Sequence, residues 1–133
     1  MDLVKLIELP SFTDDLGDLV VIDTQSQNIP FNIKRVFNVI SPKNTTRGRH
    51  AHRECSQLLI CTIGSIEVVC DNGIEVSQYL LNKSNLGLLI SPGIWSHQLY
   101  TKENTVLTVL CDHHYSEDDY IRKYEIFLKF VNN

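Results

Sequence analysis

Two histidines separated by one alanine, His50 and His52, are the residues of this chain best suited by type and spacing to do chemistry. On a β-strand, alternate side chains share a face, so both imidazoles would point one way, about 6–7 Å apart, and Ala51 the other. Imidazole takes up and releases protons near neutral pH and is also a common metal ligand. The spacing therefore predicts an acid–base pair or a metal site on one face of a strand.

Strands are the elements that must hold this pair, and their signals recur along most of the chain. Asp71-Asn72-Gly73 predicts a hairpin turn, since Asn and Gly tolerate positive φ, and Pro92-Gly93 predicts a second turn. Short strands at this spacing predict an antiparallel sandwich or barrel. The apolar or alternating runs span residues 19–22, 33–40, 57–63, 65–70, 74–81, 87–90, 96–100 and 105–110.

The C-terminal segment changes to a helical pattern. Ser116 precedes an acidic stretch, residues 117–119, in the manner of a helix cap and first turn. We expect a helix over residues 116–130 with an aromatic stripe that packs against the strands rather than binding a ligand. The stripe consists of Tyr120, Tyr124, Phe127 and Phe130.

Length and composition indicate one soluble domain. The chain has 133 residues, of which 43% are hydrophobic and 21% charged, and this fits a single domain over residues 1–133. A formal net charge of −4 argues against a nucleic-acid partner or a polybasic membrane anchor. No apolar run reaches the roughly 20 residues that span a bilayer, and the N-terminus lacks a signal-peptide pattern. The four cysteines form no Cys-x-x-Cys pair, so we expect free thiols in a cytoplasmic protein.

Four blocks in collinear order give the chain a family resemblance. They are Lys34-Arg35-Val36-Phe37, Arg47-Gly48-Arg49-His50-Ala51-His52, Pro92-Gly93-Ile94-Trp95 and Asp119-Tyr120-Ile121-Arg122-Lys123-Tyr124. Together they resemble the sugar 3,4-ketoisomerases, small cupin enzymes that act on dTDP-4-keto-6-deoxyglucose, over residues 17–130. The resemblance implies an all-β cupin (jelly-roll) barrel with a C-terminal helix. It also implies a homodimer with exchanged N-terminal strands and a dTDP-linked keto-deoxysugar as substrate.

Through this resemblance, His50 and His52 are expected to be the catalytic pair. Moving the ketone from C4 to C3 requires removal of the C3 proton, an enediol intermediate and delivery of a proton to C4. Either histidine is a candidate for the primary base. The family implies a reaction without metal or other cofactor, and Gln57 agrees, because it stands where metal-binding cupins carry a carboxylate. A three-histidine metal site completed by His97 is the alternative.

Other residues are expected to hold the substrate. The diphosphate requires an arginine, and Arg47, three residues before His50, is the first candidate. Gln57 is expected to bond a sugar hydroxyl or to orient a histidine, and Trp95 to line the sugar pocket. The full set of expected substrate-binding residues is Arg35, Phe37, Arg47, Gln57, Trp95 and His97.

Three positions depart from the usual pattern of the family. Leu16 stands where an arginine is frequent, Phe37 where a tyrosine is common, and Ser96 where a histidine follows the turn tryptophan. These departures leave open whether the product has the gluco or the galacto configuration at C4. They also leave three alternatives: a nucleotide-sugar-binding cupin without turnover, an epimerase on the same class of substrate, and a metal-dependent cupin enzyme. An active isomerase would feed a deoxysugar route to lipopolysaccharide O-antigen or to a glycosylated metabolite.

Overall fold

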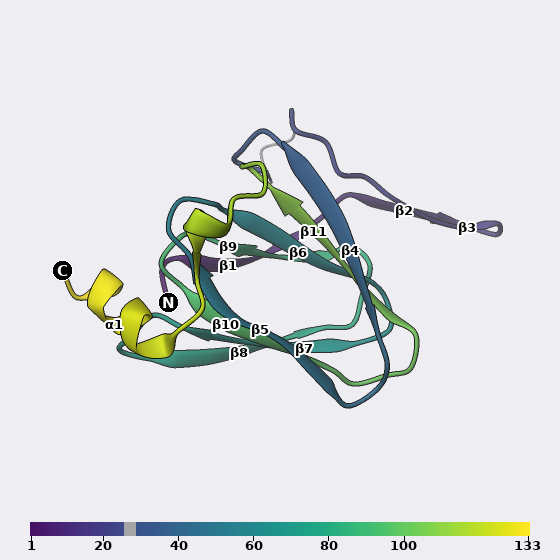
Figure 1. The fold of residues 1–133 in the computed structure, drawn as a ribbon. Helices are drawn as coiled ribbons and strands as arrows, with labels where there is room; N and C mark the ends of the chain where they lie inside the picture. The colour runs from purple at the N-terminus through teal and green to yellow at the C-terminus, as the bar shows by residue number, and fades with distance from the viewer. Residues whose placement is uncertain (26–28) are drawn as a thin grey trace.

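Residues 1–25 and 29–133 are described by the computed structural model, in which two antiparallel five-stranded sheets face each other (Figure 1). The first sheet has, in spatial order, β1 (Val4–Glu8), β9 (Leu86–Ile90), β6 (Gln57–Ile63), β11 (Thr105–Cys111) and β4 (Arg35–Ser41). The second has β12 (Tyr120–Ile121), β5 (Thr45–His52), β10 (Trp95–Tyr100), β7 (Ile66–Asp71) and β8 (Val76–Leu81). The chain is thus the all-β, jelly-roll type of barrel with a C-terminal helix that the sequence predicts.

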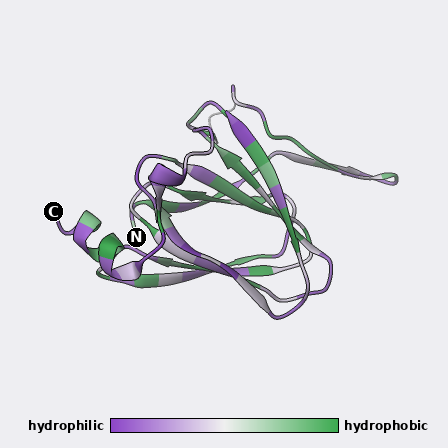
Figure 2. Ribbon diagram, in the orientation of Figure 1, coloured by the Kyte–Doolittle hydropathy of each residue, from purple (hydrophilic) through white to green (hydrophobic). Residues whose placement is uncertain are grey.

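The core lies between the two sheets because alternate side chains of each strand point inward. β7 alternates strictly between buried and partly exposed residues, and Figure 2 shows hydrophobic residues along the strands of both sheets. On β10 the inward residues are instead Ser96, Gln98 and Tyr100, all buried. One part of the barrel interior is therefore lined by groups that can form hydrogen bonds.

Most of the predicted strands are confirmed, with shifts of at most two residues at their ends. The predicted hairpin turn connects Asp71 of β7 to Val76 of β8. Within it, the Asn72 side-chain oxygen accepts hydrogen bonds from the backbone N–H groups of Ile74 and Glu75, both 2.8 Å long. These bonds explain why β8 begins two residues later than the predicted run.

The predicted helix over residues 116–130 is wrong in its first half. The elements present there are a 3-10 turn (Glu117–Asp119), β12 and the helix α1 (Tyr124–Val131). The side chain of Ser116 forms no capping hydrogen bond. Tyr120 and Ile121 pair with His52 and Ala51 of β5, so strand pairing replaces the first helical turns.

Two residues of the predicted aromatic stripe, Tyr124 and Phe127, pack against Trp95 of β10 as predicted, whereas Tyr120 lies on β12 and not on a helix. Phe127 of α1 is fully buried in a cluster with Ala51 and Ile121. The ring centroid of Trp95 lies 5.8 Å from that of Phe127 and 5.4 Å from that of Tyr124. Ala51 thus points away from the two histidines and toward α1.

Two strands project from the barrel as an arm, formed by β2 (Ser11–Asp14) and β3 (Gly17–Val20) (Figure 1). They form a sheet of their own, and in register Phe12 pairs with Leu19. These two apolar side chains are 62% and 61% exposed. The arm therefore carries apolar surface that its own barrel leaves uncovered. β1 and β2 both lie outside the predicted runs.

Within the described ranges, no helix is long and apolar enough to cross a membrane. The four cysteines are all buried free thiols, as the sequence predicts.

Candidate active site

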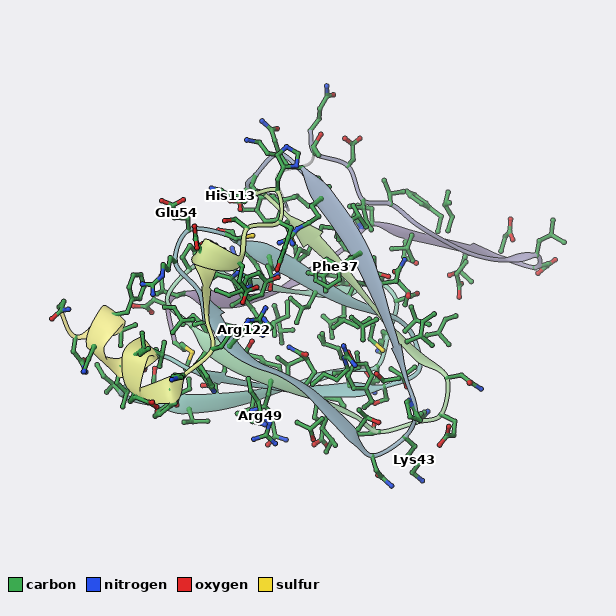
Figure 3. The ribbon with its side chains drawn as sticks, in the orientation of Figure 1. Phe37, Lys43, Arg49, Glu54, His113 and Arg122 are labelled. Carbon is green, nitrogen blue, oxygen red and sulfur yellow. The ribbon has the colours of Figure 1, made fainter. Side chains whose placement is uncertain are left out.

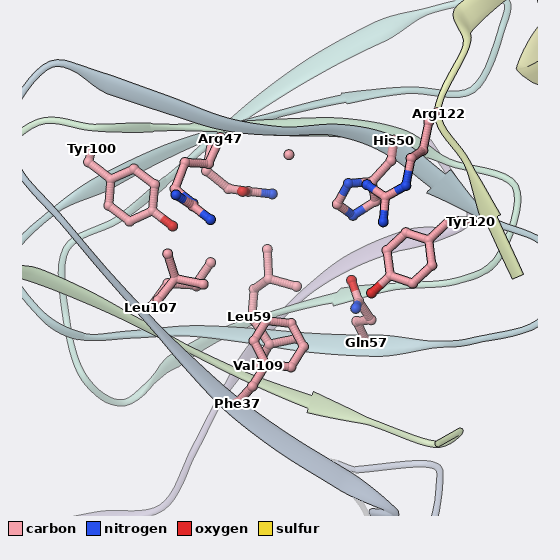
Figure 4. A pocket seen from close by; sticks show the side chains of 13 residues that line it. Phe37, Arg47, His50, Gln57, Leu59, Tyr100, Leu107, Val109, Tyr120 and Arg122 are labelled. Carbon is pink, nitrogen blue, oxygen red and sulfur yellow. The ribbon is translucent and has the colours of Figure 1, made fainter. Parts of the chain in front are cut away.

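A pocket of about 200 Å³ lies between the two sheets beside His50 (Figure 4). Its ends are polar and its middle is apolar. His50, Gln57, Tyr120 and Arg122 gather at one end, and Arg47 and Tyr100 at the other. The apolar residues between them are Phe37, Val39, Leu59, Leu107 and Val109. Such a pocket, with a few convergent polar groups on an apolar floor, is typical of a small-molecule site.

A bulge in β5 brings Arg47 and His50 to the same pocket. Residues three apart on a regular strand point to opposite faces. Here Ser96 of β10 pairs with His50 and the next residue of β10 pairs with Gly48, so Arg49 is an extra residue. Gly48 and Arg49 adopt φ values of 96° and 64°, and a Cβ on Gly48 would lie only 3.1 Å from the Ser96 carbonyl oxygen. Arg49 points away from the pocket (Figure 3).

His50 and His52 point to the same side of β5, as their spacing predicts. Their ring centroids are 5.1 Å apart and the rings are nearly perpendicular. Burial, followed by the positive charges of His52 and Arg122, lowers the pKa of His50 to about 4. The imidazole of His50 is therefore neutral at pH 7, which is the form that accepts a proton.

His52 lies behind the pocket wall and is held by Asp119. Its Nδ1 is 2.8 Å from Oδ2 of Asp119, and the two side chains are 7% and 12% exposed. Burial lowers the pKa of His52. Burial alone would raise the pKa of Asp119, but hydrogen bonds from His52 and from the Glu54 N–H lower it. A neutral His52 thus donates its Nδ1–H to the carboxylate and keeps Nε2 as the basic nitrogen.

The C-terminal segment forms one wall of the site. The Tyr120 ring centroid lies 5.1 Å from that of His50 and 4.4 Å from that of His52. The Arg122 guanidinium carbon is 4.4 Å from the centre of the Tyr120 ring. Glu117 accepts a 2.9 Å hydrogen bond from Nη2 of Arg122, which fixes the cation beside the pocket. A hydroxyl donor and a positive charge therefore adjoin the histidine pair.

Two more of the predicted residues, Phe37 and Gln57, line the pocket, whereas Arg35 does not. Gln57 is buried and its Nε2 donates to Sγ of Cys111 at 3.5 Å. The Arg35 guanidinium carbon lies 5.5 Å from the Phe37 ring centre. The hydroxyl that a tyrosine at position 37 would bring is absent, but Tyr120 brings a hydroxyl to the same pocket.

Trp95 and His97 are not among the residues that line the pocket. Both alternate with the buried residues of β10 and so belong to its outer face. Trp95 packs there against α1, and Arg49 is a charged neighbour of His97. The expected contacts of these two residues with a substrate stay a prediction, and they would have to be made outside this pocket.

Three residues that build the site, Asp119, Tyr120 and Arg122, were missed as functional by sequence reasoning. They were missed because this segment was predicted to be a helix, in which side chains do not alternate between two faces. Tyr120 and Arg122 are two residues apart and face the pocket, whereas Ile121 between them is buried against Ala51. The alternation of Tyr120, Ile121 and Arg122 with a period of two residues is typical of a strand and could have indicated that Tyr120 and Arg122 share a face.

The pocket suits proton transfer better than metal coordination, because its lining holds one histidine and no carboxylate. In the described ranges, two groups of three side chains have metal-ligand atoms within 4.8 Å of one another. They are His52–Cys55–Asp119 and Cys55–Asp112–His113, and neither contains His50.

The chain matches known proteins over nearly its whole length. Residues 2–132 match the family described as WxcM-like, C-terminal (FdtA). A TDP-4-oxo-6-deoxy-alpha-D-glucose-3,4-oxoisomerase of Aneurinibacillus thermoaerophilus is 36% identical over 128 residues, which are 96% of this chain and 91% of that protein.

Solved structures agree with the sequence matches. A 3,4-ketoisomerase from Helicobacter canadensis has a TM-score of 0.92 at 34% identity and 98% coverage of both chains. A sugar 3,4-ketoisomerase from Thermoanaerobacterium thermosaccharolyticum, solved in complex with TDP, has a TM-score of 0.93 at 35% identity, covering 98% of this chain and 95% of that one. The chain therefore belongs to the WxcM-like, C-terminal family and groups there with the sugar 3,4-ketoisomerases.

Proposed function

We propose that this chain is an isomerase that converts dTDP-4-keto-6-deoxyglucose into a dTDP-3-keto-6-deoxyhexose. The observation that carries the proposal is the pair His50 and His52, with His52 held by Asp119, in a chain of the ketoisomerase family. The Aneurinibacillus relative is named for a TDP-4-oxo-6-deoxyglucose substrate, and the Thermoanaerobacterium relative was solved with TDP. Both support a TDP-linked substrate.

The proposed reaction rearranges hydrogen within the sugar and needs no external oxidant or reductant. His50 takes the proton from C3, and the electron pair left behind forms an enediolate with its negative charge on O4. The O3 proton moves to O4 through the Tyr120 hydroxyl, which lines the pocket, and His52, whose ring centroid lies 4.4 Å from that of Tyr120, is the next group of the relay. Return of a proton to C4 then leaves the ketone at C3. Arg122 and the Tyr120 hydroxyl stabilise the enediolate oxygen.

Proton NMR of dTDP-4-keto-6-deoxyglucose incubated with the protein in D₂O, with chelator present, tests this function. The expected result is a set of 3-keto signals with deuterium at the carbon that receives the proton, and the coupling at C4 identifies gluco or galacto product. Deuterium entry without carbonyl movement would indicate an epimerase instead. TDP binding without any change would indicate a binding protein, and turnover only with added metal would contradict the metal-free mechanism.

Arg47 is proposed to bind the diphosphate, at the end of the pocket away from His50. Arg47→Ala is expected to raise KM about 10-fold or more with little change in kcat, because a hydrogen bond to a charged group is worth about 1.5–3 kcal/mol. Steady-state kinetics measure both constants. Arg49→Ala is the matched control, since Arg49 is a neighbouring arginine that the bulge directs away from the pocket. An unchanged KM in Arg47→Ala would remove this residue from the diphosphate site.

The pH dependence of kcat/KM is expected to show an acid limb far below the ordinary histidine pKa. The pKa of His50 is lowered to about 4, so the base stays unprotonated down to that region and loses activity only below it. Initial rates at low substrate concentration, with circular dichroism at each pH to verify folding, measure the limb. An inflection near the unperturbed value of about 6.5 would contradict the assignment of His50 as the base.

We also propose that the chain forms a homodimer with exchanged N-terminal strands. β1 pairs with β9 of its own chain, which leaves the projecting arm, β2 and β3, to lie on a second copy. Phe12 and Leu19 on the arm are mostly exposed, as are Val36 and Ile40 of β4 (55% and 72%). Apolar surface of this kind is typical of an interface.

The double substitution Phe12→Asp with Leu19→Asp is expected to weaken the dimer at least about 100-fold, because each large apolar side chain contributes about 1.5–3 kcal/mol when buried. Sedimentation velocity over a concentration series measures the dissociation constant. Ile74→Asp is the control, since Ile74 is an apolar residue 91% exposed in the β7–β8 turn, away from the arm. A wild-type monomer, or an unchanged dimer in the double variant, would contradict the proposal.

The proposed setting of the reaction is the cytoplasm, without metal or other cofactor. Four buried free thiols support a reducing compartment. A 3-keto deoxysugar offers a carbonyl for further modification, such as amination, before transfer to lipopolysaccharide O-antigen or to a glycosylated metabolite.

A further inference from the structure

Behind the His52–Asp119 pair, three side chains with different donor atoms lie together: Cys55, Asp112 and His113. Their sulfur, oxygen and nitrogen atoms are all within 4.8 Å of one another. We propose that they form a binding site for a thiophilic divalent cation such as Zn²⁺, separate from the substrate pocket, and that a cation bound there inhibits the isomerase. The inhibition rests on the proposed function, whereas the binding site does not.

The donor set matches the ligand preferences of zinc. Thiolate, imidazole and carboxylate bind Zn²⁺ at about 2.0–2.3 Å, which places tetrahedral ligand atoms about 3.5 Å apart. The three atoms therefore need movements only on the order of 1 Å to meet around one ion. His113 and His114 line the same cavity, from which a water molecule can take the fourth position.

Hydrogen bonds hold the two chain segments that carry these ligands side by side. The Ser56 N–H donates to Oδ1 of Asp112 at 2.8 Å, and the Asp112 N–H donates to the Ser56 carbonyl at 3.2 Å. Nδ1 of His113 lies 2.7 Å from Oδ1 of Asp112. The His113 side chain is 44% exposed, so solvent and a dissolved ion reach its ring. Ordering of the ligands before binding reduces the entropy cost of coordination.

A second cavity, of about 260 Å³, reaches the cluster at His113. Glu54, His113, Asp118 and Asp119 line it, and Glu54 and His113 lie at the same end of the barrel (Figure 3). Arg53 also lines it, but its guanidinium carbon stacks 5.4 Å from the centre of the Phe130 ring. The carboxylates of the lining attract a cation to the cavity, where His113 is the ligand that it meets first.

Cys55 connects this cluster to the catalytic machinery. Its sulfur also lies within 4.8 Å of the ligand atoms of His52 and Asp119. The neighbouring Glu54 N–H donates to Oδ1 of Asp119 at 2.7 Å. A cation that draws the Cys55 sulfur outward moves this donor and places positive charge beside the carboxylate that orients His52. Both effects weaken the hold of Asp119 on His52, so kcat is expected to fall.

Titration of the chelator-treated protein with Co²⁺ tests the site without any substrate. Because thiolate ligation gives Co²⁺ a charge-transfer band in the near ultraviolet, we expect such a band with one ion per chain. Cys55→Ser is expected to abolish the band, and His113→Ala to weaken binding at least about tenfold. Cys70→Ser is the matched control, since Cys70 is a fully buried cysteine of the barrel core and the band is expected to persist.

Any of three results would overturn the site. The first is no band in the wild type, and the second is a band that survives Cys55→Ser. The third is a band kept in His113→Ala but lost in His52→Asn, which would place the ion at the catalytic pair.

Inhibition is tested by adding Zn²⁺ to the isomerase assay. His113→Ala is expected to have wild-type activity without metal and to resist Zn²⁺. Cobalt binding with no effect of Zn²⁺ on turnover would overturn the inhibition. Absence of turnover in untreated protein would instead contradict the proposed function.

Discussion

His50→Asn is expected to lower kcat by about 10³-fold or more while folding and nucleotide binding change little. The His50 imidazole is neutral and lines the pocket, so it is placed to take the C3 proton. Asparagine is similar in size and polarity but its amide does not accept a proton near neutral pH. The loss is therefore expected in the chemical step, with KM almost unchanged.

Deuterium entry into the sugar, followed by NMR, measures this loss, and calorimetry with TDP measures the remaining affinity. His97→Asn is the matched control, because His97 lies on the outer face of β10. We expect its activity to stay at the wild-type level. An active His50→Asn variant, or an inactive His97→Asn variant, would show that the primary base is assigned to the wrong histidine.

Asp119→Asn is expected to lower kcat by about 10²-fold or more, although Asp119 has no contact with the proposed substrate. Asp119 fixes the His52 proton on Nδ1 and stabilises the imidazolium that forms during proton relay. Asparagine keeps Oδ1 as an acceptor for the Glu54 N–H, so the backbone contact survives. What is removed is the negative charge that selects the tautomer of His52.

The imidazole nitrogen chemical shifts of His52 separate this positioning role from a merely structural one. In Asp119→Asn we expect the proton to be distributed between Nδ1 and Nε2, with a melting temperature near that of the wild type. Asp118→Asn is the control, since Asp118 is the adjacent exposed carboxylate. If Asp119→Asn keeps both its rate and its Nδ1 proton, the charge of Asp119 does not orient His52.

The barrel could be predicted from local patterns because its strands carry their own signals. β7 alternates between buried and partly exposed residues, and Asn72-Gly73 marks the turn that follows. In the C-terminal segment, by contrast, local patterns predict the wrong structure. Its acidic start has the local propensity of a helix, but pairing of Tyr120 and Ile121 with β5 competes with that propensity and wins. Such pairing depends on a strand about 70 residues away, which no local window contains.

The sequence also predicts only part of the site, namely the part that depends on local strand periodicity. The histidine pair follows from strand periodicity alone. Arg47 reaches the pocket only because Gly48 and Arg49 form a bulge, which shifts the alternation by one residue. Trp95 follows the regular alternation of β10 and therefore faces α1. Periodicity describes a regular strand, whereas bulges and long-range partners are decided by tertiary packing.

The wall made by Tyr120 and Arg122 has a consequence for how this enzyme fails when it is heated. Two residue pairs with β5, the hydrogen bonds of Asp119 with His52 and the Glu54 N–H, and the packing of Phe127 attach this segment to the barrel. Short terminal elements open at a lower free energy than the strands of a core. Fraying of the tail would therefore stop turnover while the sheets stay intact. The temperature of inactivation would report detachment of this segment, and cooling would restore activity without refolding of the barrel.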